Sequence, residues 1–290
     1  MSCFDVRTKP ELAKLLLVGP FEIDHVIEKR KHYYRPVKLP KSNGTYRTLN
    51  VPCGPLKLLQ QKIKRHILDP VALSDCVHGG VLGRSVVTNA RPHIRKRVVF
   101  TLDLKDFFPS VSPGTVQKIF VALGFSVQTA DLLVQVTTWD RQLPQGATTS
   151  LGLANLSMMR VDVRLSTLAR KNGFAYTRYV DDLAFSGNER LMDFRRLIQR
   201  IVEGEGFRVN PAKICTMHSG MRQSVAKVVV NKKLNLPREK RRLIRQQVLT
   251  FASTPVRFRN NSSEIRGQLS WLSSVNPQLG FHLRKQIGNL

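Results

Sequence analysis

Three aspartates carry the most informative chemistry in this chain. Asp181 and Asp182 are neighbours between apolar and aromatic residues, and Asp103 lies in a separate apolar run. A buried strand does not carry aspartate without a reason, because an unpaired buried carboxylate is costly. If the three carboxylates converge, they repel one another unless a divalent cation neutralises them, and oxygen ligands of this kind suit Mg²⁺. Two such ions about 3.5–4 Å apart could activate a sugar hydroxyl and stabilise a leaving pyrophosphate.

The elements that carry these acids can be predicted from the local pattern. Residues 98–111 predict one continuous buried strand that carries Asp103 and Asp106, and residues 174–186 predict two strands bent around the Asp-Asp pair. An Asp-Asp pair taken alone more often marks only the tip of a hairpin, where aspartate is common. A purely structural interpretation of the pair therefore stands beside the catalytic one.

The remaining segments show turn and helix patterns. Ser42, Asn43 and Gly44 predict the turn of a hairpin inside the basic segment 29–47. Helical spacing predicts helices over 54–68, 151–171 and 190–204, with Leu58, Leu59, Ile63 and Ile67 on the packed face of the first. Two loops are also predicted: a sharp turn over 142–146, and a phosphate-binding loop and helix start over 78–97, which contains no acid. Residues 225–290 are basic and helical in character.

The overall charge indicates the kind of partner. The chain of 290 residues has 47 Lys and Arg against 20 Asp and Glu, a formal net charge of +27. With 42% hydrophobic residues it can bury a core, which argues against wholesale disorder. So large a cationic excess favours a polyanion as partner, and nucleic acid is preferred to a membrane because no apolar run approaches the roughly 20 residues that span a bilayer. We expect a cytoplasmic protein whose four scattered cysteines are reduced and bind no metal.

Three short motifs together resemble those of reverse transcriptases. Tyr179-Val180-Asp181-Asp182 resembles the YxDD box, Asp103 to Phe108 the first acidic motif, and Leu143-Pro144-Gln145-Gly146 the substrate-positioning motif, in the expected order. The likeness extends to Tyr46–Leu49 in the fingers and to the lysine-bearing Asn210–Lys213. It implies an α+β right-hand polymerase fold, with fingers, a palm that has helices on one face of an antiparallel sheet, and a short helical thumb. The domains implied are an N-terminal segment and fingers over 1–97, a palm over 98–222 with a fingers insertion at about 112–142, and a thumb over 223–290.

The resemblance also implies residue roles. Asp103, Asp181 and Asp182 would be the catalytic acids and, with the carbonyl of Leu104, the ligands of two Mg²⁺ ions. Phe108 matches the bulky gate that excludes a ribose 2′-hydroxyl. The other residues expected to bind the incoming deoxynucleoside triphosphate are Gln145 beside the sugar, Lys213 as counter-charge or proton donor, and Arg47 and Arg84.

Within this family the likeness is to bacterial retron enzymes. Asn89-Ala90-Arg91-Pro92-His93 reproduces their Asn-Ala-x-x-His run, although His93 could also be an ordinary core histidine. Their second signature, Val-Thr-Gly, reads Val225-Ala226-Lys227 here, which is a departure. The residues expected to bind nucleic acid are Asn89, His93, Lys227, Lys232, Lys233, Arg238, Arg241, Arg242 and Arg245.

A basic helix is expected in the thumb. Pro237 can start it, and Lys240, Arg241, Arg242 and Arg245 share roughly one side, which suits the backbone of A-form RNA or an RNA–DNA hybrid. The alternative is a solvated charged helix with no ligand.

The retron likeness implies RNA-directed DNA synthesis. The template and primer would be a dedicated structured non-coding RNA, and the product a branched RNA–DNA hybrid (msDNA) held by the enzyme. An effector protein encoded nearby would complete an anti-phage defence system. Two alternatives stay open: another bacterial reverse transcriptase, of the group II intron, diversity-generating or abortive-infection type, or a non-catalytic RNA-binding scaffold.

Overall fold

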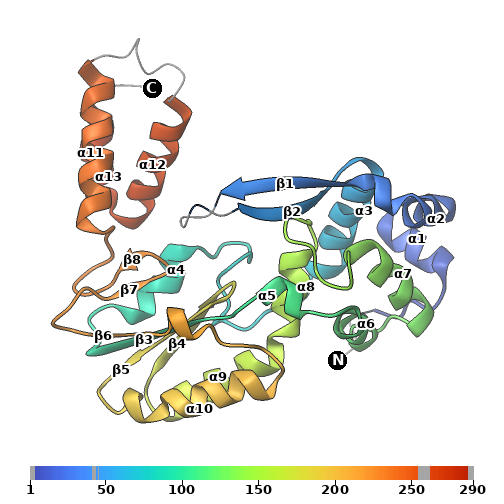
Figure 1. The fold of residues 1–290 in the computed structure, drawn as a ribbon, viewed down its shortest axis with the longest axis horizontal. Helices are drawn as coiled ribbons and strands as arrows, with labels where there is room; N and C mark the ends of the chain where they lie inside the picture. The colour runs from blue at the N-terminus through green and yellow to red at the C-terminus, as the bar shows by residue number, and fades with distance from the viewer. Residues whose placement is uncertain (1–3, 41–43, 45, 254–261, 287–290) are drawn as a thin grey trace. The chain divides into compact units, whose positions relative to one another are not determined.

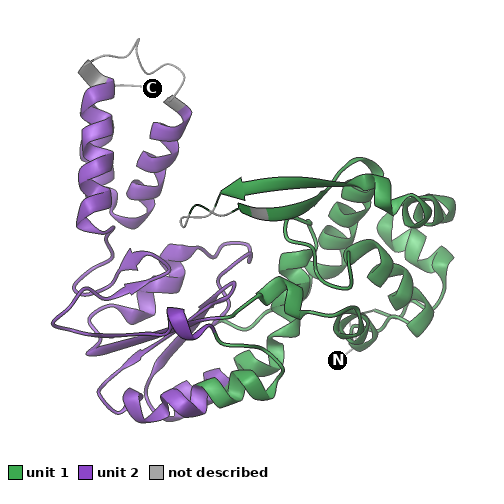
Figure 2. Ribbon diagram, viewed as in Figure 1, with its two compact units in different colours: residues 1–75, 104–164, 199–209 green, residues 76–103, 165–198, 210–290 purple. Residues whose placement is uncertain are grey.

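The computed structural model describes residues 4–40, 44, 46–253 and 262–286. The chain forms two compact units (Figure 2). The first comprises residues 1–75, 104–164 and 199–209, and the second comprises residues 76–103, 165–198 and 210–290. In the described part of the chain, no helix combines the length and the apolar character that a membrane crossing requires.

The first unit is mainly helical and carries one long hairpin. Strands β1 (Tyr34–Pro40) and β2 (Tyr46–Pro52) pair antiparallel, with Pro40 opposite Tyr46, so the predicted hairpin is confirmed. The predicted turn residues Ser42 and Asn43 lie outside the described residues. The helical elements of this unit are α1 (Lys9–Leu16), α2 (Pro20–Glu28), η1 (Arg30–Tyr33), α3 (Gly54–Ile63), η2 (Lys64–Leu68), α5 (Phe107–Ser110), α6 (Pro113–Ala122), α7 (Val127–Thr137) and α8 (Ser150–Ser157).

Two helix predictions need correction. Helix α3 and the π-helix η2 together cover the predicted span 54–68. The side chain of Leu58, however, is 60% exposed, and Leu56 is buried in its place. The buried face follows Leu56, Leu59 and Ile63, which are spaced three and four residues apart. The predicted helix over 151–171 is two helices, because the chain leaves the regular helix at the buried residue Met158 between α8 and α9 (Met159–Lys171).

The second unit is built on a four-stranded antiparallel sheet in the order β4-β5-β3-β6. The central strand β3 (Val98–Asp103) is buried on both faces, as its apolar residues predict. The continuous strand predicted over 98–111 is too long, because the chain turns at Asp106, which has a φ of 51°, and enters helix α5. Strands β5 (Asp182–Gly187) and β6 (Cys215–His218) flank β3, and β4 (Ala175–Tyr179) pairs with the other side of β5, which confirms the two strands predicted around the Asp-Asp pair. The amphipathic helix α10 (Leu191–Gly204) follows β5 as predicted. The α+β class with an antiparallel sheet is therefore confirmed.

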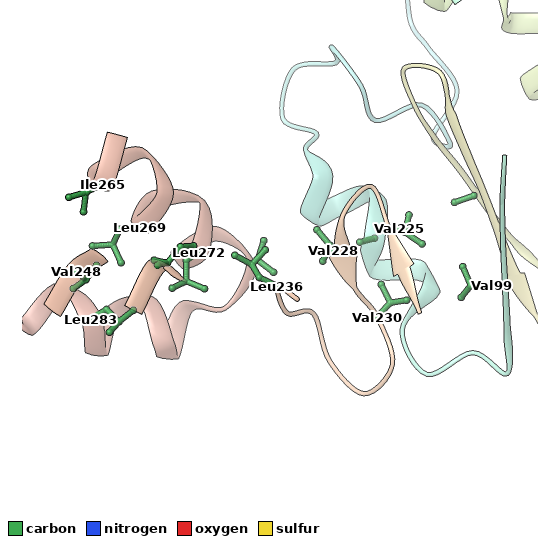
Figure 3. Close-up of a cluster of buried hydrophobic side chains, with 14 of the residues drawn as sticks. Val99, Val225, Val228, Val230, Leu236, Val248, Ile265, Leu269, Leu272 and Leu283 are labelled. Atoms are coloured by element: carbon green, nitrogen blue, oxygen red, sulfur yellow. The ribbon is translucent and has the colours of Figure 1, made fainter. Parts of the chain in front are cut away.

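Short elements before β3 and after β6 pack onto this sheet. They are α4 (Val86–Ala90), η3 (Arg91–His93), η4 (Pro211–Lys213), β7 (Ser224–Val225) and β8 (Val228–Val229). Valines of the β7–β8 hairpin share a buried cluster with Val99 of β3 and Ala184 of β5 (Figure 3). The expectation of helix from residue 225 onward is therefore wrong for residues 225–229, which form a hairpin with positive φ angles at Ala226 (45°) and Lys227 (67°).

Three helices complete the second unit: α11 (Arg238–Ser253), α12 (Ser262–Val275) and α13 (Pro277–Gln286) (Figure 1). Helix α11 starts directly after Pro237, whose carbonyl accepts from the N–H of Arg241 at 3.0 Å, as the sequence predicts. Val248, Leu272 and Leu283 are buried in the same hydrophobic cluster, one on each helix (Figure 3). The expected helical character of the C-terminal segment is confirmed over these three helices.

Candidate active site

The ends of two paired strands bring the acids together. Asp103 is the last residue of β3, Asp182 is the first residue of β5, and the two are register partners across the antiparallel pair. Side chains of directly opposed residues project from the same face of a sheet, about 5 Å apart at their Cβ atoms. Asp181 lies in the turn between β4 and β5, next to Asp182. All three candidate acids therefore lie at the same end of the two central strands of this sheet, which we call the acid edge.

A lysine partly compensates this negative charge. Lys213 is the last residue of η4. Asn210, directly before η4, donates its backbone N–H to the carbonyl of Asp103 at 2.8 Å, which holds this segment beside the end of β3. The Nζ of Lys213 donates to Oδ1 of Asp103 at 2.8 Å, while Asp103 itself is only 6% exposed. The hydrogen bond to Asp103, with further attraction from Asp181 and Asp182, raises the pKa of Lys213. The ammonium is therefore held positive beside the acids.

Asp182 experiences the opposite effect. Desolvation, followed by repulsion from Asp181 and Asp103, raises the pKa of Asp182 to about 6, against a smaller opposing influence from Lys213 and Lys227. The residue still reaches solvent, so its carboxyl is desolvated locally rather than enclosed. The carboxylates of Asp181 and Asp103 are close enough to disfavour the ionisation of Asp182.

The donor chemistry of the acid edge fits a hard divalent cation, because crowded carboxylates gain most from one. The donor atoms are not already gathered around a common point: among the described residues, no three His, Cys, Asp or Glu side chains form a ready metal-binding group. The ammonium of Lys213 lies against Asp103 instead.

Of the residues expected around the nucleotide, Phe108, Gln145 and Arg47 lie in the first unit, together with Leu104, whereas Arg84 and Lys213 lie in the second. Phe108 is half-buried in α5 with its ring centroid 5.6 Å from that of Phe107, and Leu104 pairs with Val209 in an isolated bridge. Gln145 is half-buried, and its Oε1 has no hydrogen-bond partner among the described residues. The side chain of Arg47 lies outside the described structure. The approach of these residues to the three acids stays a prediction.

The expected nucleic-acid contacts of Asn89 and His93 need correction. Asn89 is 1% exposed and His93 is fully buried, so neither side chain can reach a phosphate in this structure. Burial, with repulsion from His78 and Lys96, lowers the pKa of His93 to about 3, so its ring is neutral. Arg84, expected at the triphosphate, donates to the carbonyl of Val77 at 2.6 Å. The segment predicted to bind phosphate therefore makes mainly internal contacts at these three positions.

The basic residues of the thumb are more exposed. Lys232, Lys233, Arg238, Arg242 and Arg245 are exposed, whereas Arg241 is half-buried. The expected shared face is wrong for Lys240, whose Nζ lies 3.4 Å from Oε1 of Gln268 on α12. Successive residues are rotated by about 100° around a helix, so Lys240 faces α12 while Arg242 and Arg245 face solvent.

Sequence reasoning missed one functional candidate at the acids. Arg178 is fully buried in β4, directly before Tyr179, and its Nη1 donates to the carbonyl of Val180 at 2.9 Å. A charged residue inside an otherwise buried strand is a detectable signal, because arginine is almost never buried without partners.

The raised pKa of Asp182 predicts a gain in stability on its removal. A carboxyl whose folded pKa (about 6) exceeds its ordinary value of 3.8 destabilises the fold when ionised, fully above pH 6 and not at all well below pH 4. Asp182→Asn should therefore raise the melting temperature of metal-free protein at pH 8, by a few degrees at most because solvent screens the charge. The gain should be smaller at pH 5. Thermal melts in EDTA test this, and a lower melting temperature at both pH values would contradict it.

The comparisons with known proteins agree with these features. Residues 39–259 match the family described as reverse transcriptase (RNA-dependent DNA polymerase). The chain is 34% identical to the retron Mx65 reverse transcriptase of Myxococcus xanthus, over 97% of this chain and 71% of that protein. It is 33% identical to the retron Ec86 reverse transcriptase of Escherichia coli, over 79% of this chain and 71% of that protein. For the retron Mx162 reverse transcriptase of Myxococcus xanthus the identity is 32%, over 93% of this chain and 63% of the relative.

Among solved structures, the telomerase of Candida albicans in complex with a fragment of telomeric RNA aligns with a TM-score of 0.46 at 12% identity, over 91% of this chain and 59% of that one. A foamy viral protease–reverse transcriptase aligns with a TM-score of 0.42 at 16% identity, over all of this chain and 50% of that one. The family match over residues 39–259 and the identities along nearly the whole chain decide the assignment. The protein belongs to the reverse transcriptases, RNA-directed DNA polymerases of the right-hand fold, and among them to the retron enzymes.

Proposed function

We propose that this enzyme copies a dedicated structured non-coding RNA into DNA and keeps the product as a branched or linked RNA–DNA hybrid (msDNA). The observation that carries the proposal is the pairing of Asp103 with Asp182 across β3 and β5, with Asp181 beside them, in a chain that is 34% identical to a retron reverse transcriptase. A non-catalytic scaffold gains nothing from three acids placed where desolvation, followed by their mutual repulsion, raises the pKa of Asp182 to about 6. The enzyme would act in the cytoplasm with an effector protein encoded nearby, as part of an anti-phage defence system.

The three acids and the carbonyl of Leu104 would hold two Mg²⁺ ions. Bound there, the ions would supply activation of the priming hydroxyl and stabilisation of the leaving pyrophosphate. In the free enzyme the Nζ of Lys213 lies 2.8 Å from Oδ1 of Asp103. The side chain of Lys213 is 59% exposed, so the ammonium is free to turn toward the triphosphate as counter-charge or proton donor.

The remaining residues would select and hold the substrates. Phe108 would exclude the 2′-hydroxyl, and Gln145, whose Oε1 has no partner among the described residues, would bind at the sugar. In this proposal the fingers comprise 1–97, the palm 98–222 with an insertion at about 112–142, and the thumb 223–290. The exposed cations of the thumb would contact RNA backbone: Lys227, Lys232, Lys233, Arg238, Arg242 and Arg245.

A second candidate keeps the chemistry and changes the template. The β7–β8 turn has Lys227 at a φ of 67°, in the left-handed region that favours glycine, where typical retron enzymes have the glycine of Val-Thr-Gly. A lysine there changes the surface offered to RNA. This favours a reverse transcriptase that serves a different RNA, such as one of the intron, diversity-generating or abortive-infection types.

One experiment tests the proposal. The protein is purified from its native host without nuclease treatment, and the nucleic acid that copurifies is sequenced with and without RNase. We expect one abundant small RNA joined to DNA complementary to part of it, and DNA extension on that RNA when dNTPs and Mg²⁺ are supplied. A heterogeneous RNA population with no attached DNA would contradict the retron assignment, and no extension on any primed RNA would contradict the polymerase.

A further inference from the structure

The turn that carries Asp181 and Asp182 is strained. Val180, directly before the two acids, has a φ of 60°, a left-handed conformation that is a genuine outlier for a β-branched residue. Such a conformation persists only where the surrounding structure imposes it. Repulsion between the carboxylates adds to the tendency of this turn to relax.

Two contacts hold the strained residue, one from β4 and one from residues 76–79. The buried Arg178 donates from Nη1 to the carbonyl of Val180 at 2.9 Å. A Cβ placed on Gly79 would lie 2.6 Å from both the backbone nitrogen and Cγ2 of Val180, so the chain at Gly79 lies directly against the turn. The backbone N–H of Arg178 donates to the carbonyl of Cys76 at 2.7 Å, and the backbone N–H of His78 donates to the carbonyl of Arg178 at 2.8 Å. These two hydrogen bonds fix residues 76–78 along β4.

His93 holds the two strands that lead into and out of the turn. Its Nε2 lies 2.8 Å from Oγ1 of Thr177 on β4, and its Nδ1 lies 2.7 Å from Oγ of Ser186 on β5. Thr177 donates its hydroxyl proton to the carbonyl of Asn89 at 3.2 Å, so it accepts from Nε2–H, and Nδ1 accepts from Ser186. The neutral ring therefore completes a one-directional chain of hydrogen bonds across the base of the hairpin.

We propose that Gly79, Arg178 and His93 are positioning residues, which together hold the Tyr179–Asp182 turn in the strained geometry that directs its carboxylates toward the metal ions and the primer end. This inference rests on the proposed catalytic role of Asp181 and Asp182. It gives the segment 76–93 a function: the run Asn89 to His93 acts on the acids through β4 and β5 and not on nucleic acid directly. Because the turn is already held in this geometry, its carboxylates need not rearrange when the substrate binds.

Substitutions at Thr177 separate hydrogen bonding from packing. Thr177→Val keeps the volume but removes the acceptor of His93 and the donor to Asn89, whereas Thr177→Ser keeps the hydroxyl and loses a buried methyl group. We expect Thr177→Val to lower kcat for dNTP incorporation by on the order of 10- to 100-fold, with the RNA dissociation constant and the dNTP KM nearly unchanged. Thr177→Ser should retain kcat even if its melting temperature falls more. Thr216→Val is the matched control, because it lies on β6 of the same sheet and its hydroxyl has no hydrogen-bond partner among the described residues.

A second pair of variants tests the contact at the turn. Gly79→Ala places a methyl group against the backbone of Val180 and should also lower kcat without weakening RNA binding. Gly220→Ala is its control, because a Cβ there meets nothing within 4 Å. A kcat that stays at the wild-type level in both Thr177→Val and Gly79→Ala would overturn the proposal, as would a kcat lower in Thr177→Ser than in Thr177→Val. If Asp181→Asn is itself active, the catalytic assignment fails; if Asp181→Asn is inactive while both positioning variants are fully active, only the positioning inference fails.

Discussion

Asp181→Asn should lower dNTP incorporation by roughly 10³-fold or more, because a neutral amide would replace one of the anionic ligands that we propose for the metal ions. The asparagine has nearly the same shape as aspartate, so the β4–β5 turn can retain its form. RNA binding depends mainly on contacts between cations and phosphates and should change by no more than about twofold. Single-turnover incorporation on a primed RNA, together with filter binding of the same RNA, measures both quantities.

The matched control is the same substitution on the surface of the same unit. Asp193 is exposed on α10, and Asp193→Asn should leave incorporation unchanged. Melting temperatures identify any variant that fails to fold. Full activity in Asp181→Asn at wild-type Mg²⁺ concentration would remove Asp181 from the catalytic machinery and, with it, the proposed two-ion site.

Phe108→Ala should allow the enzyme to incorporate ribonucleotides. A ring that occupies the space beside the sugar excludes the 2′-hydroxyl by a clash that also denies the hydroxyl its solvation, and discrimination of this type reaches about 10²-fold or more. Removing the ring should therefore reduce the preference for dNTPs over rNTPs by on the order of 100-fold, chiefly by improving kcat/KM for the ribonucleotide. Paired incorporation assays with dNTP and rNTP on one template measure this ratio.

Phe108→Tyr provides the control for the gate because it retains the ring, and it should retain the preference. The half-buried Phe108 also contacts Phe107, so the alanine variant should lose about 1–3 kcal/mol of stability and must be assayed well below its melting temperature. If the sugar preference of Phe108→Ala equals that of the wild type while the protein remains folded, another residue forms the gate.

The acids and the strands that carry them could be predicted because their signals are local. The apolar run before Asp103 and the hairpin pattern around Asp181 and Asp182 need no knowledge of distant residues, and β3, β4 and β5 follow these patterns, although the strand predicted to reach residue 111 ends at Asp103. Antiparallel pairing of the strands then places Asp103 opposite Asp182. The helix errors were also local: Leu58 is one position off the buried face, and Met158 interrupts a continuous apolar pattern without a proline or glycine signal.

Chain composition and short motifs thus determined the cationic character, the three acids and the class of enzyme. The tertiary structure alone decided the partners of the site: His93 joins Thr177 across 84 residues, and Lys213 joins Asp103 across 110 residues. Periodicity and propensity report only which side of an element is apolar, whereas a hydrogen bond between distant elements depends on how their backbones are packed to within a few tenths of an ångström. For that reason His93 could be noticed in a motif and still be assigned to nucleic acid, when it is in fact enclosed beneath the hairpin that carries the acids.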